Sequence, residues 1–209
     1  IMELAARGDE IVIIDNFSTG DRRFLSDRVI HKIKLYSIDL SKISIDELAS
    51  YARGCRQIYH LAANADVRHG WQNTFRDIEQ NILVSYKIAE VARLLNIPEI
   101  IFTSTGCVYG NVSIIPTPEN HPMPIQTSLY GNSKVASEGI FSAYSAQGVF
   151  RTTVLRFVSV LGKNYHHGHI IDFVRSLIND PKSIHILGNG TQKKSYIDVS
   201  DCVKALVNI

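Results

Sequence analysis

Four short apolar runs, set far apart along the chain, constrain the possible folds more than any other feature of this sequence. They are rich in β-branched residues and apolar on both faces, as strands buried between two layers of helices must be. The runs begin about 40 to 55 residues apart, which is the spacing of parallel strands joined by crossover connections. They cover residues 11–14, 58–61, 100–102 and 153–155, and a further short strand is expected near 34–38. The sequence therefore predicts an α/β fold built on a doubly wound parallel sheet with helices on both faces.

Helical patterns occupy the intervals between these runs. The clearest covers residues 74–95 and is ended by Asn96 and Pro98, and a second is expected over 130–146. Residues 114–124 hold four of the six prolines and are predicted to form an extended loop. In the first helix, one apolar stripe is expected from Ile78, Ile82, Tyr86, Ala89 and Ala92.

Both ends of the chain carry unfinished patterns. Residues 1–8 have the pattern of the last turns of a helix that stops at Gly8, and residues 199–209 have helical spacing without a closing cap. We therefore expect the chain to be truncated at both ends, as a fragment of a longer protein.

Composition and charge exclude several classes of protein. The chain has 209 residues, of which 45% are hydrophobic, so it can bury a sizeable core. Its formal net charge is only +2, so no strongly basic surface is expected for nucleic acid or anionic lipid. No apolar run approaches the roughly 18 to 20 residues that span a bilayer, and no signal segment opens the chain. Cys55, Cys107 and Cys202 are too scattered for a disulfide framework or a zinc site, so we predict a cytoplasmic protein without nucleic-acid or membrane partners.

The first candidate site residue is Asp15, which directly follows the run at 11–14. It stands at the carboxyl end of a strand, where open α/β sheets place their ligands. A carboxylate there can accept hydrogen bonds from the ribose hydroxyls of adenosine and would repel a 2′-phosphate, which favours NAD over NADP. The alternative is a structural role, because Asp and Asn are common in turns such as 15–20. Both interpretations stay open for this residue.

A second candidate site combines Tyr130 and Lys134, which are four residues apart and so lie on one face of a helix. A free phenol has a pKa of about 10, and a nearby ammonium group favours the phenolate. Tyr130 can then exchange a proton with a sugar or alcohol hydroxyl. The spacing alone is weak evidence, because a chain with nine tyrosines can contain such a pair by chance.

Hydroxyl groups strengthen this site. The strand at 100–102 continues into Thr103, Ser104 and Thr105, which carry hydroxyls to its carboxyl end. Without the Tyr130–Lys134 pair, Ser104 and Thr105 would be interpreted as loop residues that satisfy nearby backbone groups. With the pair, they indicate a ligand site at the end of a buried strand.

Five motifs along the chain carry a family resemblance. They are IDNFSTG at 14–20, HLAA at 60–63, STGCVYG at 104–110, YGNSK at 130–134 and YIDV at 196–199. In this order they resemble the extended short-chain dehydrogenase/reductase superfamily, and within it the NAD-dependent epimerase/dehydratase family, with nucleotide-sugar epimerases of the UDP-glucose 4-epimerase type. The resemblance implies a Rossmann-like NAD-binding domain over residues 1–160, lacking its first strand and glycine-rich loop. It also implies a partial substrate-binding region, with a returning strand and helix, over 161–209.

The resemblance implies a role for each site residue. It makes Tyr130 the catalytic base and Thr105 the hydroxyl that binds the reacting sugar oxygen. It makes Lys134 the group that holds the nicotinamide ribose and lowers the pKa of Tyr130. Substrate contacts are expected from Thr105, Ser159 and Lys194. The implied cofactor is NAD, with contacts from Asp15, Asn16, Asp39, Leu40, Leu61, Ala62, Ala63, Asn81, Tyr130, Lys134 and Phe157.

The sequence also departs from the family pattern. The glycine-rich phosphate loop should precede Ile1, so the helix end that holds the pyrophosphate is absent from this chain. Gly106 and Cys107 stand where dehydratases have Asp and Glu, which argues against elimination of water. Many relatives have Asn at the position of Ser159 and Arg at that of Lys194, so the identity of the sugar nucleotide stays open.

Two weaker candidates remain. His166, His167 and His169 fall in a glycine-containing loop without Cys or acidic partners, so we expect them to face solvent or substrate and predict no metal site. The pair at 193–194 can be an ordinary solvated pair or a phosphate contact, and both interpretations stay open.

The sequence thus predicts an NAD-dependent nucleotide-sugar epimerase that inverts C4 of a UDP-sugar through a transient keto sugar. The nearer alternative is a reductase or dehydrogenase of the same superfamily, with net redox change. The more distant one is a non-catalytic NAD-binding protein, since a fold alone does not fix a function. The resemblance further implies a homodimer of the full-length protein, paired through the helices that begin at residues 74 and 130.

Overall fold

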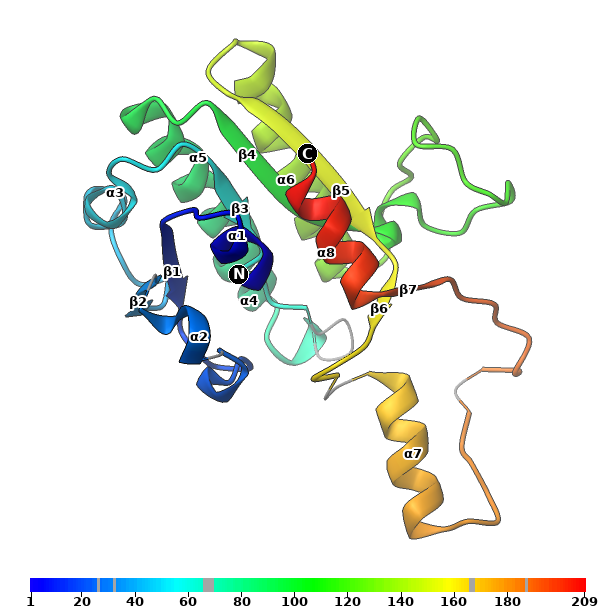
Figure 1. Ribbon diagram of the computed structural model, residues 1–209. Helices are drawn as coiled ribbons and strands as arrows, with labels where there is room; N and C mark the ends of the chain where they lie inside the picture. Colours follow the sequence, from blue (N-terminus) through cyan, green and yellow to red (C-terminus); the bar gives the residue numbers. More distant parts are fainter. Residues whose placement is uncertain (26, 32, 66–69, 166–167, 187) are drawn as a thin grey trace. The chain divides into compact units, whose positions relative to one another are not determined.

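The computed structural model describes residues 1–25, 27–31, 33–65, 70–165, 168–186 and 188–209. These residues form two compact units, Ile1–Phe157 and Val158–Ile209, and Figure 1 colours the chain along its sequence. The two units are therefore described separately below. The functional division expected at residues 160 and 161 concerns what each part binds, and it stays a prediction.

Parallel strands form the framework of the first unit (Figure 1). One ladder joins β1 to β2, and a second ladder has the order β3-β4-β5. The predicted α/β class with parallel strands is confirmed, and the strands form separate ladders rather than one continuous sheet. Their bounds are β1 Ile11–Asp15, β2 Ile33–Ser37, β3 Ile58–His60, β4 Glu99–Thr105 and β5 Arg151–Phe157.

The central strand β4 is buried from its second residue to its last. Its residues Ile100, Ile101 and Phe102 are almost completely inaccessible to solvent, because β3 and β5 flank the strand and a helix packs on it. The register places Thr105 opposite Phe157, so the carboxyl ends of β4 and β5 finish together. This arrangement carries the polar end of β4 out of the core at a defined point.

Helices lie between these strands, and those near residues 1–8, 74–95 and 130–146 were expected from the sequence. The helices at 130–146 and 84–95 lie side by side, and the former also packs on β4 and β5 (Figure 1). A further helix at 45–52, not anticipated, packs against the one at 84–95. The bounds are α1 Met2–Ala6, α2 Asp27–Ile30, α3 Ile45–Ala52, α4 Phe75–Asp77, α5 Val84–Leu95 and α6 Leu129–Ala146. Short 3-10 turns cover Arg22–Phe24, Gly70–Gln72 and Gly106–Tyr109.

The helix expected over 74–95 is not regular, because a π-helical segment at Ile78–Leu83 separates α4 from α5. The predicted apolar stripe is therefore partly wrong. Ile78 and Tyr86 are 40% and 43% exposed, whereas Ala89 and Ala92 are fully buried as expected. A π-turn holds more residues than an α-turn, so it rotates the face that follows. The buried face of α5 runs instead through Val84, Ser85, Ile88, Ala89, Val91 and Ala92.

The hydrophobic core of the first unit lies between α3, α5, α6 and the strands. Phe102 and Phe141 stand at its centre, with ring centroids 4.9 Å apart. Leu48 from α3 and Ile88 from α5 pack into the same cluster. The core thus holds α6 firmly on the sheet. The segment at 114–124, expected as an extended loop, contains no helix or strand.

The second unit is smaller. β6 (Ser159–Leu161) pairs in parallel with β7 (Tyr196–Asp198), and two helices, α7 (His169–Asn179) and α8 (Val199–Val207), complete it. The Asp198 side chain caps α8 by accepting from the Ser200 N–H at 2.8 Å. Gly162 has φ +147°, and a Cβ there would lie 2.4 Å from Val199 Cγ1, so the turn after β6 requires glycine. Across the described residues of both units, every helix is too short or too polar to cross a membrane.

Candidate active site

The candidate site of the first unit is built around the carboxyl end of β4. Thr105 is the last residue of this strand and is buried. Its hydroxyl oxygen accepts a hydrogen bond from the Cys107 N–H at 3.2 Å, which caps the 3-10 turn that follows. The structural role considered for this hydroxyl therefore exists. It does not exclude a second role, because Thr105 also contacts the Tyr130 side chain.

The start of α6 fixes where Tyr130 lies. The Ser128 hydroxyl accepts from the Gly131 N–H at 3.0 Å and caps the helix, so Tyr130 falls in the first turn. A Cβ on Gly131 would lie 2.7 Å from Gln126 Oε1 and 2.9 Å from Ser128 Oγ. The glycine of the YGNSK motif therefore lets the segment before α6 pack against the first turn.

The pKa of the Tyr130 phenol is raised above its ordinary value. Burial raises it most, the contact with Thr105 lowers it, and Cys107 and Asp77 raise it further. The lowering of this pKa expected from Lys134 is not seen, and burial raises the pKa more than the contact with Thr105 lowers it. Tyr130 is therefore protonated near neutral pH in this structure.

Lys134 lies one turn further along α6 and is 4% exposed. Its Nζ donates a hydrogen bond to the Thr103 carbonyl oxygen at 2.9 Å and lies 4.9 Å from the centroid of the Phe102 ring. Burial lowers the pKa of Lys134 to about 8, and the carboxylate of Glu138 opposes this shift. Lys134 is therefore largely charged at neutral pH, and it is held by the strand that carries Thr105.

At the end of β1, the structure shows the turn role that the sequence left open. Asp15 Oδ1 accepts from the Phe17 N–H at 2.7 Å, and Asn16 Oδ1 accepts from the Ser18 N–H at 3.0 Å. Both residues are nevertheless exposed. Because a carboxylate has two oxygens, Asp15 can form this turn and still accept from a ligand.

The next loop, after β2, carries Asp39 and Leu40. Partial burial raises the pKa of Asp39, but hydrogen bonds from Ser41 and Asn16 and the charge of Lys42 outweigh it, so the pKa lies below its usual value. Leu40 is buried in the core. The carboxylate of Asp39 is therefore charged and tied to Asn16, while the Leu40 side chain anchors the loop.

The sequence analysis missed Lys87, which organises this loop from α5. Its Nζ donates to the carbonyl oxygens of Leu40, Ser41 and Ile43 at 3.0, 2.9 and 2.8 Å. Nothing in the sequence pattern marks such a residue, because a lysine on a helix is usually solvated.

The end of β3 provides a different surface. Leu61, Ala62 and Ala63 are exposed, as a segment open to a ligand must be. Asn81 is buried and holds the end of this segment, and its expected place beside the cofactor stays a prediction. Its Oδ1 accepts from the Asn64 N–H at 2.8 Å, and its Nδ2 donates to Ser133 Oγ on α6 at 2.8 Å.

Asp77 of α4 completes this buried network and was also missed. Its Oδ1 accepts from Asn64 Nδ2 at 2.8 Å and from Asn81 Nδ2 at 3.3 Å. Its charge acts on Tyr130, which places it near the phenol. The network therefore ties the ends of β3 and the first turns of α6 to one another.

The remaining predicted residues fall into two groups. Phe157 ends β5 opposite Thr105, and its carbonyl oxygen would lie 3.6 Å from a Cβ on Gly106. Ser159 and Lys194 belong to the second unit, where Ser159 is half-buried and Lys194 is exposed. Their roles in substrate binding stay predictions.

The histidines of the second unit give no metal cluster in the described part of the chain. His166 and His167 lie outside the described residues. His169 begins α7, and its Nε2 lies 2.5 Å from the Tyr196 hydroxyl. Among the described residues, no group of three or more His, Cys, Asp or Glu side chains could hold a metal ion.

Taken together, the described strand ends fit a dinucleotide. The end of β1 offers an exposed carboxylate, the end of β3 offers small exposed side chains, and the end of β4 offers a hydroxyl, a phenol and an ammonium group. The fold and this donor set define a class, the α/β enzymes that bind a dinucleotide at the carboxyl ends of parallel strands.

A family model described as the NAD dependent epimerase/dehydratase family matches residues 1–209. The chain belongs to this family, and the prediction of NAD as the cofactor is confirmed at that level. A putative UDP-glucose 4-epimerase from Methanocaldococcus jannaschii is 29% identical over 202 residues, covering 94% of this chain and 64% of the relative. UDP-glucuronic acid decarboxylase 1 from Danio rerio is 25% identical, covering 99% of this chain and 49% of the relative. The chain thus spans about half to two thirds of the length of these relatives.

Solved structures of nucleotide-sugar epimerases are also similar to this chain. A UDP-galactose 4-epimerase matches with a TM-score of 0.83 and 30% identity, over 99% of this chain and 65% of that one. A UDP-glucose 4-epimerase from Thermotoga maritima with UDP-glucose matches with a TM-score of 0.86 and 26% identity, over 99% of this chain and 67% of that one. One from Thermus thermophilus in complex with NAD has a TM-score of 0.83 and 25% identity, over 99% and 68%. The predicted Rossmann-like fold is confirmed.

Proposed function

We propose that the full-length protein is an NAD-dependent nucleotide-sugar epimerase that inverts C4 of a UDP-sugar. One observation carries the proposal: Thr105 contacts Tyr130 at the end of β4, with the buried ammonium group of Lys134 one helical turn away. The similarity to several relatives, UDP-glucose 4-epimerases among them, supports the choice of reaction.

The residues of this chain divide the work of proton transfer. Thr105 donates a hydrogen bond to the reacting sugar oxygen and orients it toward Tyr130. Tyr130, in its phenolate form, would take the proton of the sugar hydroxyl at its phenolic oxygen and later return it. Lys134 supplies positive charge that favours the phenolate. When bound, NAD supplies the acceptor and donor of hydride.

Residues at the other strand ends would hold the cofactor. Asp15 and Asn16 would bind the adenosine ribose. Asp39 and the backbone of Leu40, whose side chain is buried in the core, would meet the adenine, on a loop that Lys87 holds by three carbonyl oxygens. The exposed segment at 61–63 would let the dinucleotide approach the backbone. The strand and glycine-rich loop expected before Ile1 would supply the pyrophosphate site.

Net redox chemistry is the nearer alternative. The same proton-transfer groups would serve a nucleotide-sugar dehydrogenase or reductase, whereas dehydration is disfavoured because Gly106 and Cys107 offer no acid and base beside Thr105. A non-catalytic NAD-binding protein would not need a buried lysine beside a hydroxyl-bound tyrosine.

The test is turnover by the full-length protein on a panel of nucleotide sugars. With UDP-glucose or UDP-galactose, NMR should show interconversion to an equilibrium mixture, and the absorbance at 340 nm should show no net NADH. NADH appearing or vanishing in proportion to product would identify the dehydrogenase or reductase instead. No turnover of any sugar, despite bound NAD, would favour the non-catalytic alternative.

In the second unit, Ser159 and Lys194 would contact the substrate, with Lys194 near its diphosphate.

The full-length protein would form a homodimer through the helices beginning at residues 74 and 130. The first of these helices carries exposed apolar side chains that fit such an interface, namely Phe75, Ile78, Leu83 and Tyr86. Light scattering of the full-length protein would show twice the monomer mass, and a monomer would contradict the pairing.

A further inference from the structure

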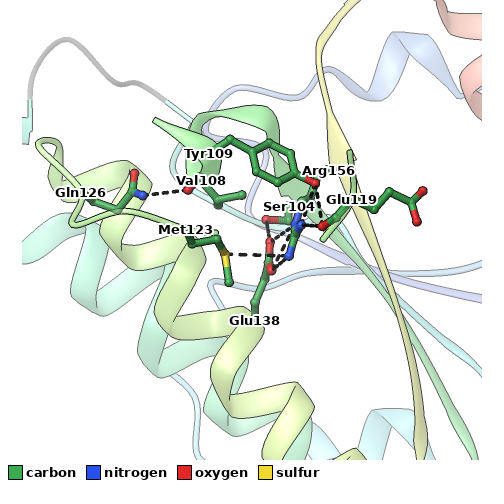
Figure 2. Close-up of polar contacts among 8 residues, drawn as sticks. All are labelled: Ser104, Val108, Tyr109, Glu119, Met123, Gln126, Glu138 and Arg156. Atoms are coloured by element: carbon green, nitrogen blue, oxygen red, sulfur yellow. Dashed lines mark hydrogen bonds and ion pairs between the residues drawn. The ribbon is translucent and has the colours of Figure 1, made fainter. Parts of the chain in front are cut away.

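A buried ion pair lies beside the proposed site and takes no part in the mechanism described so far. Glu138 comes one helical turn after Lys134 and two turns after Tyr130, so the three side chains share one face of α6. The Glu138 carboxylate is 5% exposed and accepts hydrogen bonds from the Ser104 hydroxyl and from Arg156, whose Nη2 lies 2.8 Å away (Figure 2). The carboxylate is therefore fixed from two strands, β4 and β5.

Arg156 extends this pair to a distant segment. Its Nη1 donates to the Tyr109 hydroxyl at 2.6 Å and to the Glu119 carbonyl oxygen at 2.9 Å (Figure 2). The guanidinium carbon lies 4.8 Å from the centroid of the Tyr109 ring, and Nη2 lies 3.8 Å from the sulfur of Met123. One side chain thus holds three points of the segment 109–123, which begins four residues after Thr105.

The charged groups around Lys134 show what the pair can do for the site. Glu138, on the same helix, raises the pKa of Lys134, while burial lowers it to about 8. His60 faces Lys134 from β3, and its pKa is lowered to about 3 by burial and by the charge of Lys134. His60 is therefore neutral and places no second positive charge beside Lys134. Tyr130, the other titratable group on this face of α6, stays protonated.

Further groups act on the neighbours of Lys134. Asp77 from α4 and Cys107 from the 3-10 turn act on Tyr130, and Arg156 from β5 acts on Glu138. Glu138 is thus the carboxylate in the described structure that supports the charge of Lys134. Arg156 fixes this carboxylate in position from β5, because its Nη2 donates to Glu138 Oε2 at 2.8 Å.

We propose that Glu138 is a positioning residue that keeps Lys134 protonated, and that Arg156 couples this charge to the order of the segment 109–123. Loss of either Glu138 or Arg156 then has two effects, in two parts of the site that are not in direct contact. The ammonium group of Lys134 loses its proton more easily, and the loop loses its anchor. The expected effect on turnover rests on the proposed function. The effects on the protonation of Lys134 and on the order of the segment 109–123 do not rest on it.

The chain offers a matched control. Arg151 and Glu99 form an ion pair at 2.6 Å between the same two strands, at the opposite ends of β4 and β5. Like the Glu138–Arg156 pair, it joins a glutamate to an arginine, and its two residues are register partners in β4 and β5. If a glutamate paired with an arginine of β5 acts simply as a structural tie, Glu99→Gln and Glu138→Gln should behave alike.

The experiment measures the free full-length protein by two methods that need no substrate. NMR of ¹⁵N-labelled lysine, with the signal assigned by Lys134→Met, gives the pKa of Lys134, and hydrogen exchange by mass spectrometry gives the order of 109–123. In Glu138→Gln the pKa of Lys134 should fall by about one unit or more, and exchange in 109–123 should accelerate. Arg156→Met should do the same, and Glu99→Gln should change neither quantity.

An unchanged pKa of Lys134 in folded Glu138→Gln would overturn the proposal, as would equal effects from Glu99→Gln. Should Glu138→Gln not fold, Glu138→Asp keeps the charge but withdraws it by one methylene group, and it should shift the pKa in the same direction by less. An unshifted or higher pKa in that variant would contradict the proposal as well.

Turnover adds a third readout. Lys134 must be protonated to favour the phenolate, so in Glu138→Gln kcat should begin to fall at a lower pH than in the wild type, and it should recover when the pH is lowered. A uniform loss of kcat at all pH values would mean a merely structural role and would overturn the proposal. If the protein turns over no nucleotide sugar, the proposed function fails while the NMR and exchange results still decide this inference.

Discussion

The two sides of the candidate site hold their residues in opposite ways. At the end of β4, Thr105 and Lys134 are buried, and the Lys134 ammonium group bonds from α6 to the Thr103 carbonyl oxygen of β4. At the end of β1, Asp15 and Asn16 are exposed and bonded to backbone N–H groups two residues further along. Proton transfer requires a fixed geometry and a shifted pKa, both of which burial supplies. Binding a ribose needs acceptors that a ligand can reach.

This contrast predicts which quantities a substitution changes. On the buried side, removing a charge should alter pKa values, stability and turnover together. On the exposed side, it should alter affinity for the cofactor and leave the stability of the protein nearly unchanged.

Lys134→Met should lower turnover by about 10²-fold, since no ammonium group then favours the Tyr130 phenolate. It should also remove a pH dependence of stability. The folded-state pKa of Lys134, about 8, lies below the unfolded value. Between these two pKa values the unfolded chain binds more protons, so the wild type gains stability as the pH rises from about 8 toward the unfolded value near 10.4, by up to about 3 kcal/mol.

Chemical denaturation at several pH values gives the free energy of unfolding of the wild type and of Lys134→Met. The change with pH in the difference between these two free energies measures the gain. Lys34→Met, on the edge strand β2 and exposed, serves as the control with no such change. Parallel stability curves for the wild type and Lys134→Met from pH 8 to 10 would show that Lys134 is not desolvated.

Lys87→Met tests the packed support beneath the exposed side. The substitution leaves the carbonyl oxygens of Leu40, Ser41 and Ile43 without their shared donor. The free energy of unfolding should fall by about 2 kcal/mol. Lys182→Met, at an exposed position of the second unit, should leave it unchanged. Equal stability of Lys87→Met and the wild type would mean that water replaces the lysine at no cost.

Asp15→Asn tests the exposed side directly. Asn retains an oxygen that can accept from the Phe17 N–H, so the turn should persist, while the negative charge is lost. Affinity of the full-length protein for NAD should fall about tenfold, and discrimination against NADP should weaken. Calorimetric titration with both dinucleotides measures this. A large loss of stability instead would assign Asp15 a structural role alone.

A pair of glycines gives the smallest effect. Gly139 lies exposed within α6, and a Cβ there would meet no atom within 4 Å. Gly139→Ala should therefore stabilise the protein by about 0.5–1 kcal/mol. Gly162→Ala should destabilise it, because of the positive φ and the approach to Val199. Thermal unfolding of both variants tests these two expectations. A destabilised Gly139→Ala would mean that the added methyl group meets a neighbour of α6.

Much of the framework followed from the sequence, since apolar runs and helical spacing are local properties. The strands at 11–14 and 100–102 and the helix at 130–146 lie where the pattern places them. The π-helical segment at Ile78–Leu83 could not be predicted in this way, because no residue type marks it. It moved Tyr86 from the predicted buried stripe to the surface.

The residues of the candidate site divide in the same way, into those that a local sequence pattern marks and those that it does not. Tyr130 and Lys134 were found because four-residue spacing places them on one face of a helix, and the same spacing extended by one turn would have included Glu138. Arg156 could not be found, because its partners Tyr109 and Glu119 are far away in the sequence and meet it through the loop. The burial of Asn81 could not be predicted either, because it bonds to Ser133, 52 residues further along the chain, and its place beside the cofactor stays a prediction.

The most direct test of the account is turnover by full-length Tyr130→Phe with NAD bound. Phenylalanine keeps the ring and removes the hydroxyl that takes the proton, so the account predicts a loss of about 10²–10⁴-fold in kcat with NAD content and melting temperature unchanged. Tyr51→Phe, on α3 away from β4, should retain full activity. Wild-type turnover in Tyr130→Phe would contradict the central claim that this phenol carries the proton.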